Sequence, residues 1–154
     1  MEEPNLTTSA IIGFSVKLED DSSQFYEELA RRYVDDEETL RCFSKESMNN
    51  KMLVTRTYQE TITDALEACF SFKGLNLSNH LADMTLKEDM TYYSALKLAI
   101  ELEEKAINFY LDVADRSKSL LATIPNAFRK VAERRNKRKL KLESLLERAR
   151  MCSH

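Results

Sequence analysis

The sequence predicts an all-α protein, a four-helix bundle of two helical hairpins joined by a long crossover. Three observations lead to this fold class. Only two glycines and two prolines occur in 154 residues, so little interrupts a helix. Apolar residues recur every three or four positions over four long segments. One long polar break divides these segments into two pairs, the pattern of a bundle with one crossover connection.

The first hairpin is expected over residues 9–70. Its first helix, about 9–33, directs one line of residues inward, and this line contains an acid. Its members are Ile12, Val16, Glu19, Ser23, Tyr26 and Ala30. The second helix continues to about residue 70, and its inward stripe, with Phe43, Asn50, Thr57 and Thr61 on one line, is unusually polar.

The crossover is expected over residues 71–89, because the stretch SFKGLNLSNHLADMTLKED has no long periodic run. Its glycine and its capping-type residues predict a connection with a short helix inside. The second hairpin follows over residues 90–150. Its first helix, about 90–117, again carries an acid on the inward line of Leu96, Ile100, Glu103, Ile107, Tyr110 and Ala114. Thr123 and Pro125 predict the start of the last helix. Residues 1–154 are expected to form a single domain.

Two arginines interrupt the apolar face of the last helix. Arg135 falls on the same line as Val131 and Leu142, and Arg138 lies one step further round the helix. A guanidinium group that points into a bundle costs several kcal/mol unless it is paired. An anionic partner is therefore expected opposite these arginines.

An internal repeat supplies candidate anions. The segments KLEDDSSQFYEELA and ELEEKAINFYLDVA match at a constant offset of 84 residues, and the helices that follow match at an offset of 85. Glu19 and Glu103 are the shared acids, and each precedes a tyrosine, Tyr26 or Tyr110, by seven residues. A carboxylate inside a bundle needs a cation or hydrogen bonds.

This doubled pattern resembles the ferritin-like superfamily and its rubrerythrin-like branch. The resemblance implies that each half supplies one inward glutamate and a Glu-x-x-His pair, and that these six side chains hold two iron or manganese ions. Glu19 and Glu103 match the inward glutamates. The Glu-x-x-His positions, however, hold Asn50 with Leu53 in the first half and Arg135 with Arg138 in the second. The resemblance therefore implies a degenerate diiron site.

Three interpretations of this site remain open. In the first, Arg135 and Arg138 fill the space of the lost ions and form a buried network with Glu19 and Glu103, while the core tyrosines Tyr26 and Tyr110 bond the carboxylates. In the second, the arginines reach solvent. In the third, a shifted iron or manganese site uses weak candidates: Glu19, Glu46, Asn50 and Glu103.

The first interpretation predicts a non-catalytic structural or partner-binding protein with no cofactor. The third predicts peroxide reduction, ferroxidase activity or iron handling. A further alternative is that the basic last helix binds an anionic partner, since residues 129–141 contain eight Lys or Arg but only one Glu. The resemblance implies a homodimer, and the sequence names no other protein partner.

Composition limits the remaining functions. A net charge of −3 argues against a nucleic-acid partner, and the basic run over residues 129–141 is expected to be a solvated helix face. No apolar run approaches a membrane span or a signal peptide. Three cysteines without a Cys-x-x-Cys pair favour a reducing cytoplasm, where each would be a small buried hydrophobe. His80 and His154 are expected at the surface.

Overall fold

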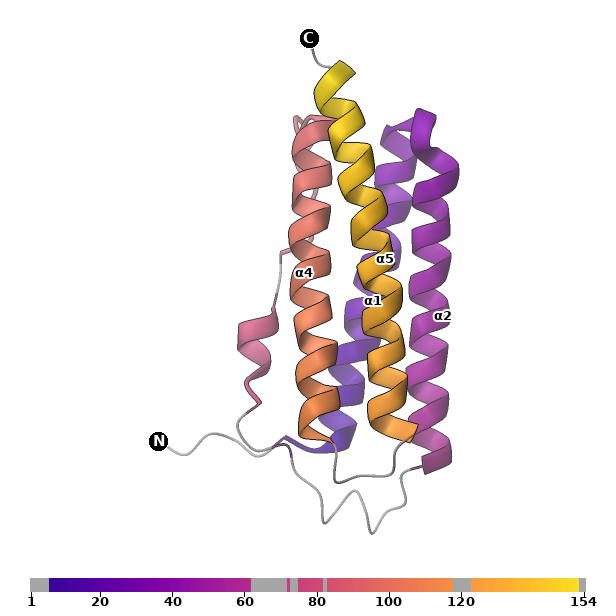
Figure 1. Ribbon diagram of the computed structural model, residues 1–154, viewed down its shortest axis with the longest axis vertical. Coiled ribbons are helices and arrows are strands. Elements are labelled where there is room, and N and C mark those ends of the chain that lie inside the picture. The colour runs from indigo at the N-terminus through magenta and orange to yellow at the C-terminus, as the bar shows by residue number, and fades with distance from the viewer. Residues whose placement is uncertain (1–5, 62–71, 73–74, 82, 118–122, 153–154) are drawn as a thin grey trace.

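The computed structural model describes residues 6–61, 72, 75–81, 83–117 and 123–152, and it is an all-α four-helix bundle (Figure 1). The four long helices are α1 (Thr8–Arg32), α2 (Glu37–Thr61), α4 (Tyr92–Arg116) and α5 (Thr123–Cys152). Two short 3₁₀ helices, η1 (Val34–Asp36) and η2 (Leu77–His80), lie in the connections. The short helix expected inside the crossover is η2.

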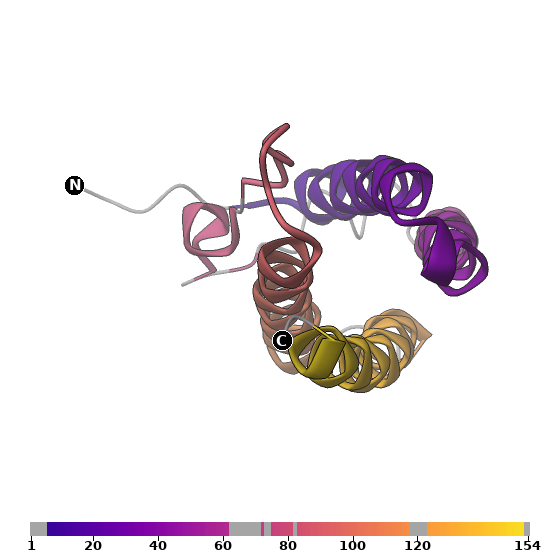
Figure 2. The same ribbon diagram turned by 90° about the horizontal axis from the view of Figure 1, so that it is seen from above.

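The helices form a ring in the order α1, α2, α5, α4, so that α1 and α5 lie on opposite corners (Figure 2). α1 and α5 run upward in Figure 1, and α2 and α4 run downward. Neighbours in the ring are therefore antiparallel. Because α2 ends at the foot of the bundle and α4 begins at its head, the connection between the two hairpins covers the length of the bundle.

Side-chain caps fix where two of the helices begin. The hydroxyl of Thr7 accepts a hydrogen bond from the backbone N–H of Ala10 at 3.1 Å, and Thr91 does the same for Ser94 at 3.1 Å. Both starts lie within two residues of the positions predicted from the pattern. The second helix was expected to reach residue 70, but it is described only to Thr61, and residues 62–70 lie outside the described part of the chain.

A polar layer at mid-height divides the apolar core in two. One apolar cluster lies toward the foot, with Ile11, Val54, Phe109, Phe128 and Val131 among its members. The other lies toward the head, with Phe25, Leu29, Leu40, Leu96 and Leu142. On α1, α4 and α5 the buried charged residues fall in sequence between these two clusters, and on α2 the buried Asn50 does. The polar groups are thus enclosed by packed apolar layers above and below.

Two expectations about single residues are wrong. Cys42 is exposed, because its neighbours on α2, Phe43 and Leu40, take the inward positions. His80 is largely buried: its side chain is 13% exposed, its ring meets Phe109 edge-on at 5.6 Å, and its Nε2 atom lies 3.3 Å from Asp112. It is covered because η2 packs on α4.

Within the described ranges, no helix combines the length and the apolar character that crossing a bilayer requires.

Candidate functional site

The candidate site is the polar layer at mid-height, to which every long helix contributes. Glu19 comes from α1, Asn50 from α2, Glu103 from α4, and Arg135 and Arg138 from α5. None of the five is more than 1% exposed. The arginines therefore do not reach solvent, and the interpretation of solvated arginines does not hold.

Arg135 joins the two repeated glutamates. Its Nε and Nη2 atoms lie 3.1 and 2.9 Å from Oε2 of Glu19, and its Nη1 atom donates to Oε1 of Glu103 at 2.8 Å. Nη2 also donates to the hydroxyl of Ser22 at 2.9 Å. One guanidinium group thus binds both carboxylates, one from each hairpin.

Arg138 extends the network toward α2. Its Nη1 atom donates to Oε2 of Glu103 at 3.3 Å and to the hydroxyl of Ser47 at 3.0 Å. Its Nε and Nη2 atoms both donate to Oε1 of Glu46, at 3.1 and 2.7 Å. The guanidinium carbon lies over the Tyr26 ring, 5.3 Å from its centroid. Glu46 is 36% exposed, so the network reaches the surface there.

The two core tyrosines cross between the hairpins. Tyr26 of α1 donates to Oε2 of Glu103 at 2.6 Å, and Tyr110 of α4 donates to Oε2 of Glu19 at 2.5 Å. The hydroxyl groups of Tyr110 and Ser15 lie 2.8 Å apart. Each half of the internal repeat therefore supplies the tyrosine for the carboxylate of the other half.

Asn50 closes the layer on the α2 side. Its amide nitrogen donates to Oε1 of Glu19 at 3.3 Å, and its amide oxygen accepts from Nη1 of Arg134 at 3.0 Å. A single neutral side chain therefore connects a buried anion to a half-buried cation. In this position it acts as a hydrogen-bonding link.

Burial and ion pairing act in opposite directions on the charged groups. Burial alone would raise the pKa of Glu103, but Arg135, Arg138 and the Tyr26 hydroxyl together hold this pKa below its usual value. Burial also opposes the charge of Arg135, yet Glu103 and Glu19 raise its pKa well above the usual value. The ion pairs therefore favour the ionised forms of Glu103 and Arg135.

The tyrosine hydroxyls stay protonated in this layer. Burial, and then the nearby carboxylate of Glu103, raise the pKa of Tyr26 well above its usual value. Burial and the carboxylate of Glu19 do the same for Tyr110. A protonated hydroxyl is the form that can donate to a carboxylate.

The polar layer is balanced in charge and in hydrogen bonds. Two buried carboxylates meet two buried guanidinium groups, and at the rim Glu46 and Arg134 add one charge of each sign. Among the described residues, the hydroxyl of Thr8 is the one buried side-chain polar atom without a hydrogen-bond partner. Each buried polar side-chain atom of the layer thus has at least one hydrogen-bond partner.

The residues present do not fit the dinuclear iron or manganese centre that the resemblance implies. The Arg135 guanidinium lies between the two retained glutamates, within 3.1 Å of each. Leu53 has no donor atom, and an arginine remains a cation. Within the described part of the chain, no three His, Cys, Asp or Glu side chains group so that they could hold a metal ion.

Sequence reasoning named most of this layer but missed its hydroxyl groups. It named Glu19, Glu103, Arg135, Arg138, Tyr26 and Tyr110, and the structure brings all six together. Glu46 and Asn50, weighed as metal ligands, lie in the layer as partners of Arg138 and Glu19. Sequence reasoning overlooked Ser15, Ser22, Ser47 and Arg134, although Ser15, Glu19, Ser22 and Tyr26 recur at helical spacing along one face of α1.

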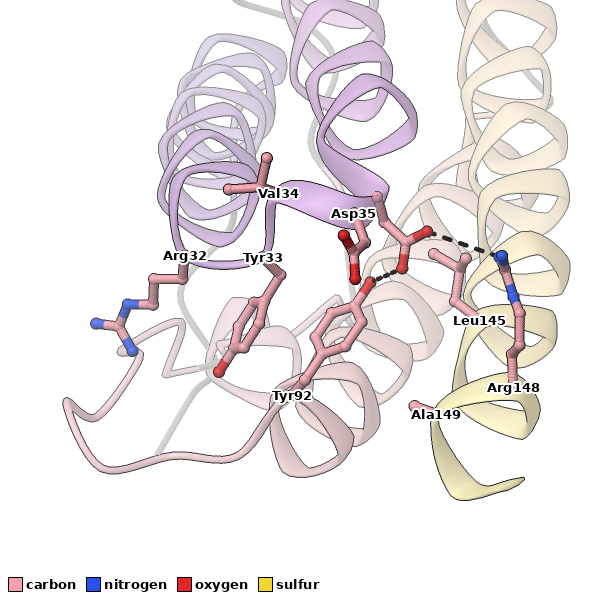
Figure 3. Close-up of a pocket in the computed structure, with 9 residues that line it drawn as sticks. Arg32, Tyr33, Val34, Asp35, Tyr92, Leu145, Arg148 and Ala149 are labelled. Atoms are coloured by element: carbon pink, nitrogen blue, oxygen red, sulfur yellow. Dashed lines mark hydrogen bonds and ion pairs between the residues drawn. The ribbon is translucent and has the colours of Figure 1, made fainter. Parts of the chain in front are cut away.

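A second feature is a pocket of about 390 Å³ at the head of the bundle (Figure 3). The rings of Tyr33 and Tyr92 stack there with centroids 4.3 Å apart. Tyr92 donates to Asp36 at 2.6 Å, and Arg148 of α5 lies 3.7 Å from the same carboxylate. Burial and this hydrogen bond raise the pKa of Tyr92. These polar groups bind one another and tie η1 to α4 and α5.

Comparisons with protein-family models, with curated proteins and with solved structures give no match for this chain.

Proposed function

We propose that this chain is a ferritin-like bundle of the rubrerythrin type in which an organic ion network has replaced the dinuclear metal centre, and that it serves as a non-catalytic structural or partner-binding protein. The observation that carries the proposal is the bridge made by Arg135. Its guanidinium binds Glu19 and Glu103 at hydrogen-bond distance where the resemblance implies metal. The internal repeat supports the family assignment, because both retained glutamates lie at equivalent positions of its halves.

The contacts of the carboxylates support a non-catalytic role. Metal-carboxylate redox chemistry requires a metal with open coordination positions. In this chain Glu19 accepts from Arg135, Tyr110 and Asn50, and Glu103 accepts from both arginines and Tyr26. Both carboxylates are therefore occupied as acceptors and enclosed by apolar layers.

A structural role follows from what the network requires. Its charges are satisfied only when all four helices align at one height, since each helix contributes a member. A helix shifted by one turn would leave a buried charge unpaired, at a cost of about 3–5 kcal/mol. We therefore assign the polar layer the task of fixing the register of the bundle.

Metal analysis tests the proposal. The protein is expressed in medium supplemented with iron and, separately, with manganese, and its bound metal is measured by elemental analysis after gel filtration. We expect substoichiometric metal in both cases. Near-stoichiometric metal that is lost in the variant Glu103→Gln would overturn the proposal.

A gain of metal provides the matched positive control. The double variant Arg135→Glu with Arg138→His restores the family's Glu-x-x-His pair on α5 beside Glu19 and Glu103. We expect this variant, and not the parent, to acquire iron or manganese and to unfold at higher temperature when metal is present. Equal metal content in the parent and the variant would contradict the replacement of metal by arginine.

A further inference from the structure

Positive charge is concentrated on one helix, α5. α5 carries ten of the 23 Lys and Arg residues but only three of the 26 Asp and Glu residues. Its formal charge is therefore +7, while the rest of the chain carries −10. Two of its cations, Arg135 and Arg138, are neutralised in the polar layer, and the others lie at or near the surface. The net charge of −3 hides this separation.

Four of these surface cations form a straight line, the basic ridge: Lys130, Arg134, Lys137 and Lys141. Their spacing of four, three and four residues keeps them within an arc of about 60° on the helix. At about 1.5 Å per residue the ridge is about 16 Å long. Lys130, Lys137 and Lys141 are exposed, and Arg134 is half-buried beside α2.

The three lysines of the ridge are free to bind an external anion. Within the described part of the chain, the ammonium groups of Lys130, Lys137 and Lys141 take part in no hydrogen bond or ion pair. Glu133 flanks the ridge, and Glu46 of α2 is bound by Arg138. Among the residues that the structure describes, no ion pair therefore neutralises the three lysines.

We infer that the basic ridge binds the phosphate backbone of double-stranded nucleic acid without reading its sequence. A strand of duplex carries one phosphate per about 3.4 Å of helix axis, so a ridge of about 16 Å faces roughly five phosphates. Lysine binds phosphate as a flexible point charge and needs no fixed base edge. This partner goes beyond the metal-free scaffold and does not depend on it.

The composition of the ridge favours duplex over other anionic partners. Its arc holds no apolar or aromatic side chain, whereas protein interfaces gather aromatic residues and methionine at their centre and exclude lysine. Single strands are held largely by stacking on aromatic rings, which the ridge lacks. A membrane surface binds a helix through an exposed apolar face, but the apolar face of α5 is buried in the bundle.

The acidic remainder of the molecule weakens this binding but does not abolish it. The acids of α1 lie on the opposite corner of the ring (Figure 2). With helix axes about 10 Å apart, the diagonal is about 14 Å. This exceeds the Debye length of about 8 Å at physiological salt, so the repulsion from the acids of α1 is largely screened. The acids of α2 and α4 lie on the helices next to α5 and lower the affinity more.

The test is a titration of a labelled short duplex, followed by fluorescence anisotropy at salt concentrations from about 50 to 200 mM. Four phosphate contacts predict a slope of log affinity against log salt of about −3.6, a loss on the order of 10²-fold over this range. The triple variant Lys130→Gln, Lys137→Gln, Lys141→Gln should bind far more weakly, and its slope should fall by about three.

A charge-matched control separates the ridge from net charge. The variant Lys17→Gln, Lys45→Gln, Lys97→Gln removes the same charge from exposed positions on α1, α2 and α4, and should bind duplex like the parent. Urea unfolding checks that both variants fold.

Three results would overturn the inference. The first is an equal loss of affinity in both variants, and the second is no binding of duplex at about 50 mM salt. The third is tighter binding to phosphatidylserine vesicles or to polyglutamate than to duplex. Any of these results leaves the metal analysis unaffected, because Arg135 and Arg138 lie outside the ridge.

Discussion

The hydroxyl of Tyr26 donates to Oε2 of Glu103 at 2.6 Å, although the two residues belong to different hairpins. The equivalent residues of the internal repeat, Tyr110 and Glu19, make the same contact in the opposite direction. The two contacts join the hairpins through both of their buried acids. The stability of the polar layer therefore depends on hydrogen bonds that cross from one hairpin to the other.

Tyr26→Phe removes one of these contacts and leaves the ring in place. Because the acceptor is a buried carboxylate, we expect the free energy of unfolding to fall by about 1.5–3 kcal/mol. Tyr33→Phe is the matched control, since its hydroxyl donates to the neutral backbone oxygen of Met90 and should contribute about 0.5–1.5 kcal/mol. Urea titrations of the two variants measure the difference, and equal losses would contradict it.

Arg135→Leu leaves Glu19 and Glu103 without their shared cation. We expect it to lower the free energy of unfolding by about 3–5 kcal/mol. Lys139→Leu is the control, because its ion pair with Glu104 spans 3.3 Å at the surface and should contribute less than about 1 kcal/mol. Chemical denaturation followed by circular dichroism compares them. A small loss for Arg135→Leu would mean that the two carboxylates find other partners.

Replacing the buried ions and tyrosines of the network together should cost less than removing one cation. An apolar layer needs no ion pairs, and exchanging a buried ion group for apolar residues of similar volume is often neutral or stabilising. A variant with six substitutions makes this exchange: Glu19→Leu, Tyr26→Phe, Glu103→Leu, Tyr110→Phe, Arg135→Met and Arg138→Met. We expect this sixfold variant to be more stable than Arg135→Leu in the same urea titration. A sixfold variant less stable than Arg135→Leu would show that the layer contributes net stability.

Acid should weaken the bundle through Glu103. Its pKa is lowered in the folded state, so below the unfolded value of about 4.5 the unfolded chain takes up a proton that the folded chain does not. The stabilisation from Glu103 is full above that value and is lost as the pH falls through the folded pKa. For one carboxylate the slope reaches about 1.4 kcal/mol per pH unit.

The variant Glu103→Gln has no such proton to take up. We expect the gap in urea midpoint between the parent and this variant to be constant from about pH 5 to 7, and to narrow below about pH 4.5. A gap that stays constant down to acid-induced unfolding would show that Glu103 is already protonated at neutral pH.

The sequence predicts the helices well because their apolar period is strong and uninterrupted. Residues 9–33 were expected for the first helix, and α1 covers Thr8–Arg32. The acids and tyrosines of the polar layer could be named because the repeat places Glu19 and Glu103 at equivalent inward positions. The arginines could be named because a charge on an apolar line requires a partner.

The remaining partners depend on geometry that a helical period does not contain. A serine on an inward line is indistinguishable in sequence from a small core residue, so the contacts of Ser22 and Ser47 with the arginines could not be foreseen. Arg138 has a long side chain with many rotamers, and only the distance between α2 and α5 decides that it reaches Glu46. The helical period likewise does not show whether an acid on a neighbouring helix lies close enough to pair with the lysines of the ridge.

Both guanidinium groups of the central layer come from α5, while α1 and α2 contribute carboxylates and an amide. Two copies of the first hairpin would face each other with uncompensated negative charge, and two copies of the second would carry four cations on only two acids. The halves of the duplicated chain have thus become complementary and no longer interchangeable. A polar layer built from two copies of either half would carry a net charge, whereas the layer built from one of each is neutral.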